Sequence, residues 1–208
     1  MLNTEKFDKV VLFDGKNLDK WQHKDGNPAN WEIKDGKMTV TEGAIFTKEK
    51  FEDVYLHLEF SVPHMPDKTG QAKGNSGVFL KDRYEIQILD SYGYEVPGKS
   101  DCGSIYNMYA PLVNACKPAK EWQTYDILFR AARFDDNGEI LEKPRMTVIH
   151  NNILIQNNVK IINPTRKPGP IKPGSGPLML QDHGDPVSFR NIWLAKLPLN
   201  GSDLYEPK

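Results

Sequence analysis

Short runs of alternating apolar and polar residues recur along the chain, separated by clusters of Gly, Pro, Asn and Asp. The runs are rich in β-branched and aromatic residues, and helical periodicity is almost absent. This pattern predicts short strands joined by turns, as in a sandwich or barrel. The expected strands are Lys9–Phe13, Trp31–Ile33, Lys37–Val40, Ala44–Thr47, Val54–Val62, Ser76–Leu80, Tyr84–Leu89, Gln123–Ala132, Arg145–His150, Ile153–Val159, Pro177–Gln181 and Val187–Leu197.

Turn and loop signals lie between these runs. The tetrapeptides His150–Ile153 and Lys34–Lys37 are typical of tight hairpins, because Asn, Asp and Gly tolerate the positive φ of primed turns. The segment Ser91–Lys120 shows little alternation, and Asn163–Gly176 contains four prolines and three glycines. Both segments are expected to be loops, because proline is excluded from central strands.

The strand pattern and the chain length together predict an all-β fold. We expect a β-sandwich of two antiparallel sheets, each with one face on the core, and a single domain spanning residues 1–208. The outer face of one curved sheet would then be free to bind a ligand.

Composition narrows the classes of partner. The formal net charge of −1 gives no overall field that would attract nucleic acid, so no nucleic-acid partner is expected. No apolar run has the length of a membrane span, and the N-terminus lacks the pattern of a signal peptide. The chain is therefore expected to be cytoplasmic or to have lost an export signal.

The chain has two cysteines, Cys102 and Cys116, in one loop-like segment. Zinc sites use more ligands at tighter spacing, so no metal site is expected from this pair. Two free thiols and a disulfide remain open alternatives.

The segment Tyr84–Ser91 has the clearest polar face. Side chains alternate along a strand, so Glu85 and Gln87 should point away from the core, and one bulge would bring Asp90 to the same face. A solvated polar face is the simpler alternative interpretation of this segment.

A second polar cluster ends the apolar run Pro177–Leu180. Gln181 and His183 should point away from the core, and Asp182 lies between them. A histidine beside aspartates suits proton transfer, although a capped turn is the commoner use of such a sequence. Weaker indications of a sugar site, which combines amides, aromatic rings and guanidinium groups, come from Asn75, Gln123 and Arg190 with their neighbours.

Taken in order, several segments make the chain resemble the 3-keto-disaccharide hydrolase domain family. They are Leu12–Trp21, Gly74–Leu80, Tyr84–Ser91, Pro111–Ala115, Trp122–Ile127, Gly176–Gly184 and Phe189–Trp193. The resemblance implies a concanavalin A-like jelly roll and action on glycosides oxidised at C3. It also implies export in Gram-negative bacteria, with a periplasmic or cell-surface location.

The leading hypothesis for the reaction is elimination, because a C3 ketone acidifies the C2 proton. Glu85 is the expected base, His183 a base or proton donor, and Asp90 or Asp182 could orient His183. The expected substrate-binding residues, which hold a small carbohydrate, are Asn75, Gln87, Gln123, Gln181, Asp182 and Arg190. No metal or cofactor is expected.

Two alternatives to this enzyme remain open. A non-catalytic, lectin-like module would use the same amides and aromatic rings. Laminarinase-like enzymes carry Glu-x-Asp-x-x-Glu on one strand, and Glu85, Gln87 and Asp90 repeat that spacing with an amide in the middle. That amide disfavours an ordinary two-carboxylate glucanase.

Overall fold

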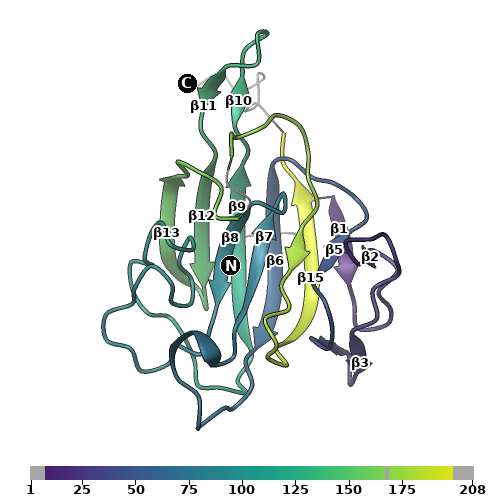
Figure 1. The fold of residues 1–208 in the computed structure, drawn as a ribbon, viewed down its shortest axis with the longest axis vertical. Helices are drawn as coiled ribbons and strands as arrows, with labels where there is room; N and C mark the ends of the chain where they lie inside the picture. Colours follow the sequence, from purple (N-terminus) through teal and green to yellow (C-terminus); the bar gives the residue numbers. More distant parts are fainter. Residues whose placement is uncertain (1–7, 167–168, 199–208) are drawn as a thin grey trace, which may run out of the picture.

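Two antiparallel sheets pack face to face in the computed structural model, which describes residues 8–166 and 169–198. Sheet A has the order β13-β12-β9-β6-β15-β4-β3, and β1 also pairs with β15. Its strands are β13 (Ile153–Lys160), β12 (Arg145–His150), β9 (Gln123–Arg130), β6 (Val54–Ser61), β15 (Ser188–Lys196), β4 (Lys37–Thr39), β3 (Glu32–Lys34) and β1 (Lys9–Phe13). Its long strands run side by side in Figure 1.

Sheet B is shorter and has the order β2-β5-β14-β7-β8. Its strands are β2 (Trp21–Gln22), β5 (Ile45–Thr47), β14 (Met179–Leu180), β7 (Ser76–Leu80) and β8 (Tyr84–Ile88). A separate hairpin, β10 (Arg133–Phe134) and β11 (Ile140–Glu142), projects beyond one end of the sandwich (Figure 1). Within the described ranges the helical structure is one 3-10 turn, η2 (Gly70–Ala72), and no helix is long and apolar enough to cross a membrane.

The core lies between the sheets and follows from strand alternation. On β9 every second side chain is buried, beginning with Gln123 and continuing through Tyr125, Ile127 and Phe129. From β7 and β8 of sheet B the buried core positions are Val78, Leu80, Tyr84, Ile86 and Ile88. The all-β sandwich predicted from the sequence is therefore confirmed.

The expected strands are confirmed to within two residues at each end. Both hairpins also form, with positive φ at Asp35 and Gly36 in one and at Asn151 and Asn152 in the other. The sequence pattern missed β2, β10 and β11, which have only two or three residues each. The described parts of the two expected loops contain no strand, although Ile105 forms an isolated bridge to Ile86 behind β8.

A buried ion pair ties the residue just before β6 to the segment after β9. Asp53 is 6% exposed and accepts hydrogen bonds from the backbone nitrogen of Ala131 at 2.8 Å and from Arg133 Nη2 at 2.5 Å. Breaking a buried pair leaves a charge without compensation, so we expect Asp53→Asn to lower the free energy of unfolding by about 3 kcal/mol.

Urea unfolding of both chains measures this change. Glu142→Gln is the matched control, because Glu142 lies on the exposed strand β11 and pairs with Arg130 at the end of β9. The control should unfold at nearly the parent midpoint. An unchanged midpoint in Asp53→Asn would show that the buried pair adds nothing to stability.

Candidate functional site on the outer face of sheet B

Two rows of side chains cross the outer face of sheet B. Strand pairing aligns Phe46 with Met179, Met179 with Phe79, and Phe79 with Glu85. The neighbouring row pairs Gly77 with Gln87, and the backbone nitrogen of Gln181 donates to the carbonyl of Gly77 at 3.0 Å. Phe46, Met179 and Phe79, on β5, β14 and β7, form a row of apolar side chains that we call the apolar floor. This row ends at polar groups on β8.

Glu85 is the acid on this face whose pKa is shifted most. Its side chain is on the outer face, yet the residue is only 5% exposed. Burial raises the pKa of Glu85 from 4.5 to about 8, and the Arg166 guanidinium opposes part of that rise. A carboxyl group with such a pKa populates both its protonated and its ionised form near neutral pH, as general acid–base catalysis requires.

Amide groups surround this carboxyl group. With its amide nitrogen toward Glu85, Gln87 donates to Glu85 Oε1 at 3.2 Å and to the Ser76 carbonyl at 3.0 Å. Asn75, which directly precedes β7, is 2% exposed, and its Nδ2 donates to the Gln71 carbonyl at 2.7 Å. In this orientation the amide of Gln87 contacts the carboxyl of Glu85 directly.

Gly77 leaves the space that Glu85 fills. A Cβ atom at position 77 would lie 2.6 Å from Glu85 Oε1 and 3.3 Å from Gln181 Oε1. The carboxyl of Glu85 and the amide of Gln181 therefore meet above this glycine. Gln181 Oε1 is buried and has no hydrogen-bond partner among the described residues, which leaves it available to a ligand hydroxyl.

Arg166 covers the apolar floor beside Glu85. Its Nη1 donates to Asp82 Oδ1 at 2.9 Å and lies 2.7 Å from Met179 Sδ, while its guanidinium stands 5.5 Å from the Phe79 ring centroid. Because the ion pair with Asp82 is partly exposed, it fixes the position of Arg166 more than it adds stability. Arg166 places a permanent positive charge next to the buried acid.

A cavity of about 700 Å³ opens on this side of the molecule. The lining residues come from the segment between β2 and β3, from β5 and the loop before it, and from the segments before and after β14: His23, Lys24, Asp25, Asn30, Glu42, Gly43, Ala44, Phe46, Arg166 and Asp182. Its volume is within the range of small-molecule sites. Phe46 and Arg166 belong both to this cavity and to the face that carries Glu85.

Among the expected catalytic residues, Glu85 alone contacts the amides of this face. Asp90 is buried and forms an ion pair with Lys73 at 3.0 Å. Asp182 lines the cavity, where its carboxylate accepts from the backbone nitrogens of Gly43 at 2.7 Å and Gly184 at 2.8 Å. His183 is exposed on the turn after β14, and no described contact joins it to Glu85.

Two expected substrate-binding residues, Gln123 and Arg190, lie on sheet A instead. Gln123 is fully buried at an inner position of β9, where its Oε1 accepts from His150 Nε2 at 2.9 Å. Arg190 is on the outer face of sheet A, paired with Glu59 at 2.7 Å and stacked 4.0 Å from the Trp122 ring centroid. The structure therefore corrects their expected placement beside Glu85: Gln123 faces the core, and Arg190 lies on the opposite side of the sandwich.

Sequence reasoning missed Arg166 and His23. Arg166 lies in the proline-rich segment that was expected to be a solvated loop, and no strand periodicity marks it. His23 follows the two-residue strand β2, and its ring nitrogens lie 2.8 Å from Asn30 Oδ1 and 3.3 Å from the Ala44 carbonyl. The only signal in the sequence is a basic side chain near a turn, which is too common to select these two residues.

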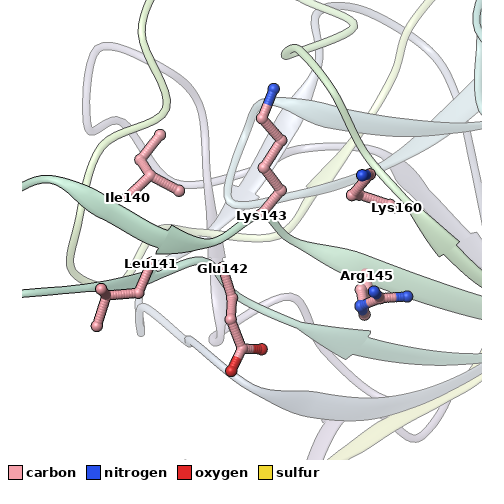
Figure 2. Close-up of a pocket in the computed structure, with 6 residues that line it drawn as sticks. All are labelled: Ile140, Leu141, Glu142, Lys143, Arg145 and Lys160. Atoms are coloured by element: carbon pink, nitrogen blue, oxygen red, sulfur yellow. The ribbon is translucent and has the colours of Figure 1, made fainter.

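A second hollow, shown in Figure 2, has a different character. It is lined by Ile140, Leu141, Glu142, Lys143, Arg145 and Lys160. Lys143 and Glu142 point in opposite directions in this view, and Glu142 is held by Arg130 at 2.7 Å. The lining lacks amide and aromatic groups, so this hollow is a poorer candidate for a sugar site than the face of Glu85.

The fold and this face define a β-sandwich protein with a buried acid beside amide groups and an apolar floor. The chain belongs to the family described as the 3-keto-alpha-glucoside-1,2-lyase-like domain, whose profile matches residues 8–195. This match confirms the resemblance seen in the sequence. No curated protein matches the chain.

Solved structures from Parabacteroides distasonis ATCC 8503, each described as a proposed glycosyl hydrolase, share the fold. One is 41% identical with a TM-score of 0.85, and the alignment covers 91% of this chain and 84% of that chain. A second is 26% identical with a TM-score of 0.63, covering 91% and 99%. A third, at 18% identity and a TM-score of 0.68, supports the fold alone. Family and neighbours together indicate a glycosyl hydrolase-like function.

Proposed function

We propose that this protein cleaves glycosides oxidised at C3 by elimination across C1 and C2, followed by hydration. The observation that carries the proposal is Glu85, a buried carboxyl with a pKa raised to about 8 among amides. Direct hydrolysis of an ordinary glycoside uses two acids flanking the bond. A single perturbed acid suits removal of one activated C–H proton.

The proposed steps balance as follows. Ionised Glu85 removes the proton from C2, and the electron pair moves into the enolate of the C3 ketone. The enolate re-forms the ketone as the C1–O bond breaks, and the leaving oxygen takes a proton. Water then adds its hydroxyl to C1 and a proton to C2, which yields the 3-keto sugar and the free alcohol.

The neighbouring groups have matching roles in this proposal. Arg166 supplies positive charge beside Glu85 and favours the enolate, since a fixed charge in a partly buried site stabilises charge that develops in the transition state. Gln87 binds sugar hydroxyls, and so does Gln181 Oε1, which has no hydrogen-bond partner among the described residues. The apolar floor of Phe46, Phe79 and Met179 receives the C–H face of the ring.

Isotopes test the route. In heavy water, a 3-keto glycoside should yield a sugar product that carries solvent deuterium at C2, because hydration follows loss of that hydrogen. Spontaneous exchange is measured by incubating substrate and product without protein over the same time course. Release of the alcohol with the C2 hydrogen fully retained would refute elimination.

A binding-only protein is distinguished in the same experiment. It would bind 3-keto glycosides without releasing alcohol, whereas the proposed enzyme turns them over. Matched glycosides without the C3 ketone should stay intact with either protein. Their efficient cleavage would favour an ordinary glycosidase instead.

A further inference from the structure

Three potential metal ligands meet in the core behind β8. Cys102 and Cys116 come from the long loop between β8 and β9, and His150 ends β12. One ligand atom from each lies within 4.8 Å of the other two. Cys102 and His150 are buried, and Cys116 is partly exposed. The fold thus adds a third ligand to a cysteine pair that appears alone in the sequence.

His150 has an unused ring nitrogen. The residue is fully buried, and its Nε2 lies 2.9 Å from Gln123 Oε1. That oxygen also accepts from the Lys117 backbone nitrogen at 3.0 Å, so His150 Nε2 must carry the proton and donate. Nδ1 therefore keeps a lone pair, and it has no hydrogen-bond partner among the described residues.

This arrangement is typical of a metal-binding histidine. In protein metal sites one ring nitrogen usually donates to an oxygen that fixes the tautomer, and the other nitrogen binds the ion. An unsatisfied buried nitrogen otherwise costs about 1–3 kcal/mol. The thiols of Cys102 and Cys116 in the same cluster supply soft ligands of the kind that zinc-class ions prefer.

We propose that Cys102, Cys116 and His150 form a site for a divalent thiophilic cation of the zinc class. Binding converts two thiols to thiolates and releases two protons, so two negative charges meet one divalent ion. The buried site is then neutral overall, whereas a monovalent ion would leave a net negative charge in the core. The Tyr125 hydroxyl also lies here, 3.1 Å from Cys102 Sγ.

The site has a direct connection to the strand that carries Glu85. The Tyr125 hydroxyl donates to the Gln87 carbonyl at 2.7 Å, and the Gly103 backbone nitrogen donates to the same oxygen at 2.9 Å. An ion on Cys102 would hold Gly103 and Tyr125 in place behind Gln87. We therefore expect the ion to stabilise the fold, and this inference stands without the proposed reaction.

Zinc and cobalt titrations of the reduced, metal-free full chain test the proposal. We expect one Zn²⁺ per chain, release of protons on binding and a higher melting temperature. Co²⁺ should give the near-ultraviolet charge-transfer absorption of cobalt bound to thiolate. No saturable binding by the wild-type chain would overturn the proposal, and so would isolation of the chain with a Cys102–Cys116 disulfide and no metal.

Variants locate the ion. Cys116→Ser and His150→Gln should each weaken zinc binding at least about 100-fold, since loss of an outer partner alone costs roughly 10–100-fold. His64→Gln, at an exposed histidine, is the matched control and should bind like wild type. Zinc binding that survives unchanged in Cys116→Ser would place the ion elsewhere and overturn the site.

Discussion

Glu85→Gln is expected to lower kcat on a 3-keto glycoside by about 100- to 10,000-fold, the usual cost of removing a general base. The glutamine keeps the shape of the side chain and the contact with Gln87, so KM should change much less. A loss confined to kcat is the signature of a group that acts in the transition state. Steady-state kinetics of both chains measure the two constants separately.

The pH profile gives a second readout of the same residue. As a base, Glu85 must be ionised, so kcat/KM of the wild-type enzyme should rise with pH to a plateau above an apparent pKa of about 8. A profile that instead falls through pH 8 would assign Glu85 as the acid. Full activity in Glu85→Gln would remove it from the mechanism.

Stability provides the control for misfolding. The pKa of Glu85 in the folded chain, about 8, lies above its ordinary 4.5, so the folded state binds the extra proton between these values. The stabilisation from that proton is complete below pH 4.5 and is lost as pH rises to about 8. Glu85→Gln avoids this loss, so at pH 9 its unfolding midpoint in urea should be at least as high as that of the parent.

Glu59→Gln is the matched carboxylate control for activity. Glu59 lies on the outer face of sheet A and pairs with Arg190, away from the face of Glu85. The variant should keep kcat within about twofold of the parent. A comparable loss in both variants would point to a general defect of the sandwich rather than to a role for Glu85.

Alternation along single strands was sufficient to place the centre of the site. It predicted that Glu85 and Gln87 share an outward face, and the register between β7 and β8 shows both on the outer side of sheet B. Gln181 reaches the same face because β14 pairs with β7. That pairing joins segments about a hundred residues apart, and local sequence contains no information on it.

The failures have the same origin. Alternation shows that Arg190 points outward, but it does not say from which sheet, and Arg190 is on the far side of the sandwich. Gln123 occupies an inner position, where His150 and Lys117 satisfy its oxygen, while its amide nitrogen has no hydrogen-bond partner among the described residues. Arg166 is positioned by contacts to Asp82 and Met179 that follow only from the assembled sheet.

Gly77→Ala is expected to reduce kcat about 100-fold while leaving the fold intact. The new methyl group would stand 2.6 Å from Glu85 Oε1 and 3.0 Å from Phe79 Cε2. The carboxyl is the far end of a flexible side chain and can rotate away, and Gly77 has no positive φ that an alanine would strain. The clash therefore displaces the catalytic group, and a displacement of about 1 Å can cost about 100-fold in rate.

Gly98→Ala is the control that separates this effect from a general effect of an added methyl group. Gly98 is exposed, and its added Cβ would also meet a carboxylate, Asp101 Oδ2 at 3.2 Å. We expect Gly98→Ala to retain kcat, and both variants to melt within a few degrees of the parent. Wild-type turnover in Gly77→Ala would mean that the reaction tolerates a displaced Glu85, which contradicts its assignment as the base.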